Sequence, residues 1–163
     1  MYSGAILGIY LVIKFYISVF GGENIFTSFV GVLLALLVPY FTYKFQLKYR
    51  NEQLDGYITY SNSFTYGIYL FFYASLMLGF GQFIYFHFIN PDFLTNAFKK
   101  SIDLMQQFGM PEKIIDEAIS KPFPSAISTV LQSILINSFI GMLISSVTSI
   151  AVKKIDTFKS ENE

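Results

Sequence analysis

Four stretches of the chain are apolar and nearly free of charge, and polar or proline-containing segments separate them. They cover residues 3–21, 25–43, 60–90 and 125–152. About 17 to 25 apolar residues in a helix cross the hydrocarbon core of a bilayer. The pattern therefore predicts an all-α membrane protein in which residues 1–163 form a single domain with four transmembrane helices.

The third stretch is the one around which the others are expected to pack. It contains no Asp, Glu, Lys or Arg between Gly56 and Pro91. Drawn as a helix, it places small residues on one side and bulky residues on the other. Small residues allow membrane helices to approach closely, so the small side should contact other helices and the bulky side should face lipid. The small side consists of Ser63, Gly67, Ala74, Ser75, Gly79, Gly81 and Gln82.

Small residues also recur in the first and fourth stretches. Gly4 and Gly8 form a GxxxG pair in the first, and every fourth residue is small or polar in part of the last. Each four-residue step advances about 40° around a helix, so such a stripe favours a close crossing with another small-sided helix. We expect the last stretch to cross the third along the stripe Ser133, Asn137, Gly141, Ser145 and Ser149.

Residues 91–121 lie between the third and fourth spans, and their pattern predicts an amphipathic helical hairpin outside the bilayer core. Apolar residues from Leu94 to Phe108 recur at every third or fourth position, as in an amphipathic helix. Gly109 favours a helix stop, and Pro111 favours the start of a second helix that ends at Ser120. Acidic residues offset the lysines of this segment, so its apolar face is expected to lie either on lipid or on protein.

The composition excludes several classes of protein. Only 13% of the residues are charged, whereas soluble domains carry about 25%. The 11 basic and 11 acidic residues cancel and the basic ones form no patch, so we expect no nucleic-acid partner. The chain has no cysteine, which excludes disulfides, thiolate metal sites and thiol nucleophiles.

The sequence contains none of the common nucleotide-binding, metalloprotease or hydrolase motifs. Its single histidine, His87, is either a proton-sensitive partner of Asp92 or an interfacial residue, and one histidine cannot assemble a metal site alone. No acid–base pair can be placed at one site, and no acidic residue lies within a span. We therefore expect neither an enzyme nor an ion-coupled transporter, with no catalytic residue, metal site or cofactor.

Three strongly polar side chains fall within the predicted spans, and these are Lys14, Gln82 and Asn137. A lysine at the centre of a span costs about 2.5–3.5 kcal/mol on insertion scales, although its long stem can carry the ammonium to the nearer interface. Two interpretations remain open. The three residues line a small polar site between helices, or they form interhelical hydrogen bonds and reach the interface.

Basic residues suggest the orientation of the spans in a bacterial inner membrane. They flank the spans after Lys44 and after Lys153, whereas the turn at residues 21–24 has none. Cytoplasmic segments carry an excess of Lys and Arg, so both termini are expected in the cytoplasm and the hairpin outside it. The first stretch has neither a basic leader nor a convincing cleavage site, and we expect a retained span.

The segment YRNEQLDGYITYSNSFTYGIYLFFYASLMLGFGQFIYFHFINPDF carries a family resemblance. It combines a charged turn and Gly56, an aromatic-polar entry into the third span, Gly67 within the span, and an ending through Asn90 to Phe93. This segment resembles the signature of a family of small bacterial four-span membrane proteins of unknown function. The resemblance implies a four-helix inner-membrane architecture over nearly the whole chain, and it brings no assigned activity and no catalytic residues.

Two hypotheses for function follow. The first is a non-enzymatic accessory or scaffold subunit whose small-residue faces pack internally, against a membrane-protein partner or against a second copy. The second is a small carrier or binding protein for a lipid or amphipathic solute, in which Lys14, Gln82 and Asn137 face a cavity covered by the hairpin.

The orientation is directly testable. A reporter fused after Glu163 should be active in the cytoplasm, because the basic residues favour that side. A fusion that is active only outside the cytoplasm would overturn the assignment.

Overall fold

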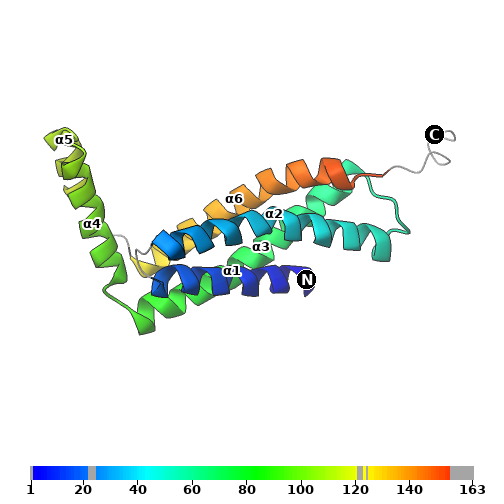
Figure 1. Ribbon diagram of the computed structural model, residues 1–163, viewed down its shortest axis with the longest axis horizontal. Helices are drawn as coiled ribbons and strands as arrows, with labels where there is room; N and C mark the ends of the chain where they lie inside the picture. Colours follow the sequence, from blue (N-terminus) through cyan, green and yellow to red (C-terminus); the bar gives the residue numbers. More distant parts are fainter. Residues whose placement is uncertain (1, 22–24, 121–122, 124, 155–163) are drawn as a thin grey trace.

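The computed structural model describes residues 2–21, 25–120, 123 and 125–154. Within these residues the chain is helical and contains no strand, which confirms the predicted all-α class. Figure 1 shows the long helices side by side and a helical hairpin that stands across one end of them. The elements are α1 (Tyr2–Phe20), α2 (Ile25–Gln53), α3 (Tyr60–Ile84), the π-helical turn η1 (Tyr85–Ile89), α4 (Phe93–Gln107), α5 (Glu112–Ser120) and α6 (Ala126–Val152).

Among the described residues, four helices are long and apolar enough to cross a membrane, namely α1, α2, α3 with η1, and α6. Their bounds lie close to the predicted spans except in α2, which continues past residue 43 to Gln53. Polar side chains on this extension, described below, bond to α3 and to the end of α6. The predicted turn at residues 22–24, the prolines at 122 and 124 and the tail from residue 155 lie outside the described residues.

Local capping sets where two of the membrane helices begin. The Thr59 hydroxyl accepts a hydrogen bond from the Asn62 amide at 3.3 Å at the start of α3, and Ser125 does the same for the Ser128 amide at 3.1 Å at the start of α6. These side chains satisfy amide groups that have no partner within the first helical turn. Before α3 the chain reverses at Gly56, whose φ of +86° suits a residue without a Cβ.

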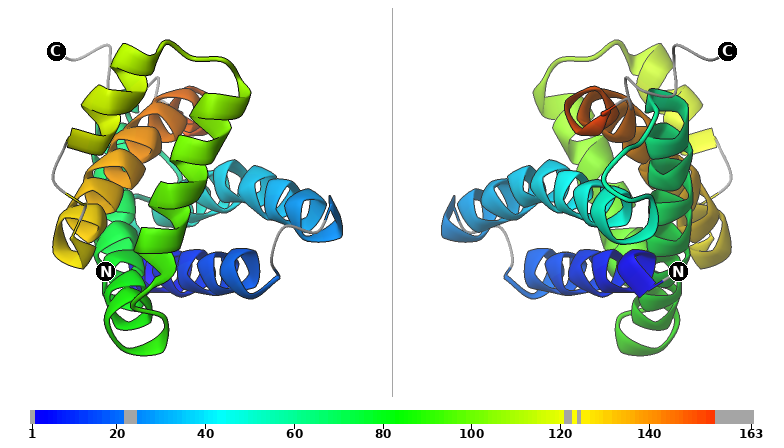
Figure 2. Two further views of the ribbon diagram at one scale, coloured as in Figure 1. Left: turned by 90° about the vertical axis from the view of Figure 1, so that its left-hand side faces the viewer. Right: turned by 90° about the vertical axis from the view of Figure 1, so that its right-hand side faces the viewer.

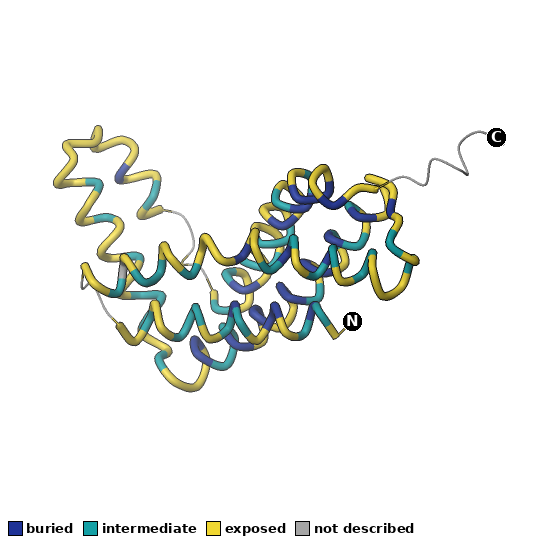
Figure 3. Tube along the Cα trace, turned by 45° about the vertical axis from the view of Figure 1, so that its right-hand side comes forward, coloured by how far each residue is buried: buried dark blue, intermediate teal, exposed yellow. Residues whose placement is uncertain are grey.

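The centre of the bundle is α3, which packs between α1 and α6 and also touches α2. Figure 3 shows that the buried residues follow these contacts, while the hairpin is mostly exposed. The small side of α3 is buried, including Gly67, Ser75 and Gly79, except for the half-buried Gln82, whereas bulky residues such as Tyr69 and Phe80 are exposed. In a bilayer these exposed faces meet lipid.

Glycines bring α3 close to both of its main neighbours. A Cβ added at Gly141 of α6 would overlap the Phe71 ring of α3, and one added at Gly67 would overlap the Ser145 hydroxyl. On α1, a Cβ at Gly4 or Gly8 would press on α3 side chains. Ser145 and Ser149 are buried, whereas Ser133 and Asn137 are half-buried. The contact therefore follows the later part of the small-residue stripe more closely than its start.

Polar bonds tie the helices together at the end of the bundle where Tyr2 and Lys154 lie, which we call the terminal end (Figure 1). The Gln46 side-chain amide donates to the Ser63 carbonyl at 3.2 Å and to the Ser149 hydroxyl at 3.1 Å. Arg50 donates to the Val152 carbonyl at 2.9 Å. Away from water, breaking such bonds leaves unsatisfied polar groups, so these bonds hold α2, α3 and α6 in register.

The opposite end, the hairpin end, is more open. Figure 2 shows the first half of α2 projecting away from α3 and α6, whereas α1 stays on α3, where the Tyr16 hydroxyl donates to the Gly81 carbonyl at 3.3 Å. Along this half of α2, large side chains such as Phe26, Phe29 and Leu36 are exposed. The hydroxyl of Tyr10 donates to the Leu34 carbonyl at 2.5 Å and links α1 to α2.

The hairpin contacts the bundle at its base. Phe93 and Leu94 pack on Tyr85, Phe86 and Val130. Asp92 occupies the N-cap position of α4, although its side chain makes no capping bond. Gly109, with φ of +65°, follows α4, and α5 starts at Glu112, one residue after the predicted Pro111. The predicted hairpin thus exists, and its outer part extends beyond the four long helices.

The close approach of α3 and α6 generates a stability prediction. Gly141→Ala places a methyl group against the Phe71 ring, and overpacking of this kind costs about 1–3 kcal/mol. The melting temperature in detergent should fall by roughly 2–10 °C. Gly31→Ala is the matched control, because nothing lies within 4 Å of the added Cβ. Equal melting temperatures for the two variants would contradict the close packing of α6 on α3.

Candidate functional site

A cavity of about 240 Å³ lies between α1, α3 and α6, nearer the hairpin end than the terminal end. The structure brings Lys14, Gln82 and Asn137 together around it, although they lie on three different helices. The cavity is open rather than enclosed. The remaining lining residues are Leu11, Phe15 and Ser18 of α1 and Leu78 of α3.

The polar groups of this cavity are only partly satisfied. Lys14 is half-buried, and its ammonium forms no hydrogen bond or ion pair with any residue that the structure describes. The side-chain oxygen of Gln82 is buried and has no bonding partner among these residues. Asn137 turns its amide nitrogen back to Ser133, donating to the carbonyl at 2.8 Å and to the hydroxyl at 3.3 Å. Within the described ranges, the cavity therefore combines an unpaired cation with a buried, unbonded amide oxygen.

This set of groups suits a ligand with two different ends. The Lys14 ammonium and the Ser18 hydroxyl can donate hydrogen bonds to an anion, and the Gln82 amide can present its oxygen or its NH₂ group. The side chains of Leu11, Phe15 and Leu78 supply an apolar wall beside them. A cationic lysine does not favour a metal ion, and the described ranges hold no group of three or more His, Cys, Asp or Glu side chains placed so that they could bind one.

Comparison with known proteins places the chain in a family. Residues 2–154 match the family described as "Protein of unknown function (DUF4199)". The chain belongs to the DUF4199 family. The match covers nearly the whole chain, as the resemblance of the third-span segment implied. No curated protein and no solved structure matches the chain. The family brings no activity with it, so the function of this DUF4199 member has to be argued from its own residues.

His87 of this DUF4199 member lies outside the cavity. It is exposed, its ring stacks on Phe83 at 5.4 Å between centroids, and it meets the edge of Phe88 at 4.8 Å. No bond joins it to Asp92 in the described part of the chain. These contacts favour the interfacial interpretation of His87 over the proton-sensitive pair.

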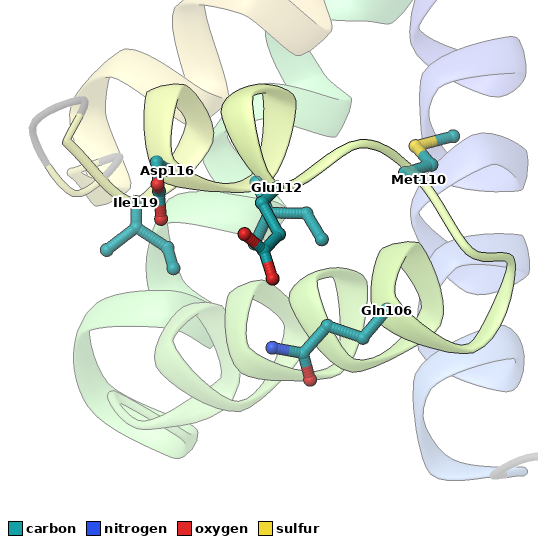
Figure 4. Close-up of a pocket in the computed structure, with 6 residues that line it drawn as sticks. Gln106, Met110, Glu112, Asp116 and Ile119 are labelled. Atoms are coloured by element: carbon teal, nitrogen blue, oxygen red, sulfur yellow. The ribbon is translucent and has the colours of Figure 1, made fainter.

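Sequence reasoning missed two further cavities, which lie between the two helices of the hairpin. Their volumes are about 430 and 330 Å³, and Ile119 lines both. Figure 4 shows Glu112, Asp116 and Ile119 pointing from α5 towards α4. The available signal was the spacing of Glu112 and Asp116, which puts two carboxylates on the same side of α5 as Ile115 and Ile119. The periodicity of α4 alone did not reveal that the two helices leave a gap.

Proposed function

We propose that the protein is a non-enzymatic, membrane-embedded binding protein for a lipid or amphipathic solute with a negatively charged head. The observation that supports this proposal is the half-buried ammonium of Lys14, unpaired within the described residues, beside the unpartnered oxygen of Gln82 in one cavity between membrane helices.

The energetics favour an anion. A lysine within a span costs about 2.5–3.5 kcal/mol at the centre of the bilayer. A hydrogen bond to a charged group contributes about 1.5–3 kcal/mol. An anion bound to Lys14 would therefore offset most of the cost of keeping this cation among apolar helices.

The size and shape of the cavity favour recognition of a head group. A volume of about 240 Å³ lies below the range of about 300–1,000 Å³ that holds whole drug-sized ligands. Since the cavity is open, the aliphatic part of the ligand can leave it and lie along the exposed apolar faces in the bilayer.

We also propose that the protein lies in an inner membrane with both termini in the cytoplasm. The basic residues at the ends of α2 and α6 support this orientation, since both helices end at the terminal end and cytoplasmic flanks are rich in Lys and Arg. The ligand would then be taken from the outer half of the bilayer.

A second candidate is an accessory subunit of a membrane complex. The observation that favours it is the first half of α2, where Phe26, Phe29 and Leu36 are exposed on a helix that projects away from α3 and α6. A helix of a partner protein could pack on this exposed face of α2, which lipid covers in the first proposal.

The amphiphile proposal is tested by replacing Lys14. In phosphatidylcholine nanodiscs, the native protein should immobilise spin-labelled stearate or phosphatidylglycerol in preference to spin-labelled phosphatidylcholine. Lys14→Gln removes the charge-assisted bond, so binding of the preferred anionic probe should weaken by at least about tenfold. The same variant should melt at a higher temperature, because an unpaired charge is removed from the apolar region.

The matched control is Lys44→Gln, which removes the same charge from an exposed position near the terminal end, where Lys44 lies over the Tyr40 ring. It should bind the anionic probes as the native protein does. Binding of both anionic probes no tighter than that of phosphatidylcholine, or an equal loss in both variants, would refute the proposal.

The two candidate functions are separated by native mass measurement. The protein, purified from its own membranes in a mild detergent, should appear as the chain with a retained anionic lipid if amphiphile binding is its function. Co-purification of a second protein in fixed ratio, without lipid, would instead favour the accessory subunit.

A further inference from the structure

The space between α4 and α5 forms one groove, which we call the hairpin groove and define by the residues around both cavities. On α5 these are Glu112, Ile115, Asp116 and Ile119, with Met110 before it, and on α4 they are Phe98, Lys99, Ile102, Asp103 and Gln106. The two helices that form it, α4 and α5, stand apart from the long helices (Figure 1).

The hairpin groove is a surface of mixed polar and apolar character that the two helices do not close. Ile119 remains 54% exposed and Met110 43% exposed, although both line the space between the helices. Two packed helices normally interlock their side chains at about 8–10 Å between axes, which would bury these residues. A third apolar element would fill the groove and complete a small three-layer unit.

The charged side chains around the groove indicate which kind of element would bind there. Glu112 and Asp116 lie in the groove beside Ile115 and Ile119, and neither forms an ion pair with a residue in the described part of the chain. A bilayer pressed onto the groove would desolvate both carboxylates, which is costly without a counter-charge. A second copy would bring the same acidic excess, because Lys99 is outnumbered by the three carboxylates around the groove, those of Asp103, Glu112 and Asp116.

We propose that the hairpin groove binds a basic amphipathic helix of another protein outside the membrane. The apolar side of that helix would cover Ile115 and Ile119, and its Lys or Arg residues would pair with Glu112 and Asp116. Both carboxylates lie four residues apart on one side of α5, so cations at the same spacing on the incoming helix match them. This surface is separate from the Lys14 cavity, and neither proposal depends on the other.

Site-specific photocrosslinking tests the proposal in cells that carry the full chain. A benzophenone amino acid at Met110 or Ile119 should link to another protein, and mass spectrometry should place the link in an amphipathic helix that carries Lys or Arg. Crosslinking yield should fall by about threefold or more in the double variant Glu112→Gln and Asp116→Asn, since two ion pairs are lost.

The matched control removes two carboxylates of the same segment that do not line the groove, with Asp92→Asn and Glu117→Gln. Its crosslinking yield should equal that of the native chain. Adducts only with lipid, with a second copy or within the same chain would overturn the proposal, as would a partner segment without basic residues or an equal loss of yield in both double variants.

Discussion

Close approach of the helix backbones at glycine is the constraint on which the rest of this membrane domain depends. A bilayer offers no hydrophobic gain when two apolar helices meet, so association relies on packing contacts and a few hydrogen bonds. At Gly141 and Gly67 the absence of a side chain lets α6 and α3 meet Phe71 and Ser145 at contact distance. Because α1 also packs on α3 along Gly4 and Gly8, α3 supports both α1 and α6, whereas α2 packs mainly on α6 and α1.

The two ends of the bundle are held in different ways, and this difference creates the cavity. At the terminal end, Gln46 and Arg50 bond to the carbonyl or hydroxyl groups of neighbouring helices. Towards the hairpin end α1 and α2 lean away from α6, and a cavity remains where Lys14 meets Gln82 and Asn137. The polar bonds hold the helices together at the terminal end, and the open end contains the cavity in which we propose that an anionic head group binds.

The hairpin extends beyond the four long helices, and the forces that pack its two helices together differ from those that pack the spans. On the proposed placement of the hairpin in water, the apolar sides of α4 and α5 should be driven together, yet they leave a gap beside Glu112 and Asp116. A carboxylate within the groove loses hydration when the groove closes, which is costly without a cationic partner. The membrane cavity and the hairpin groove thus present opposite charges, one on Lys14 and the other on acidic side chains.

Periodicity and composition over a few helical turns were enough to predict the all-α class, the four spans, the hairpin and three polar residues within spans. They could not show that Lys14, Gln82 and Asn137 share one cavity, since this depends on how three distant helices cross. The bond from Gln46 to Ser149 and the gap beside Ile119 likewise emerge only from the packed helices. Local patterns report which face of a helix is polar, whereas the angle between helices determines what that face meets.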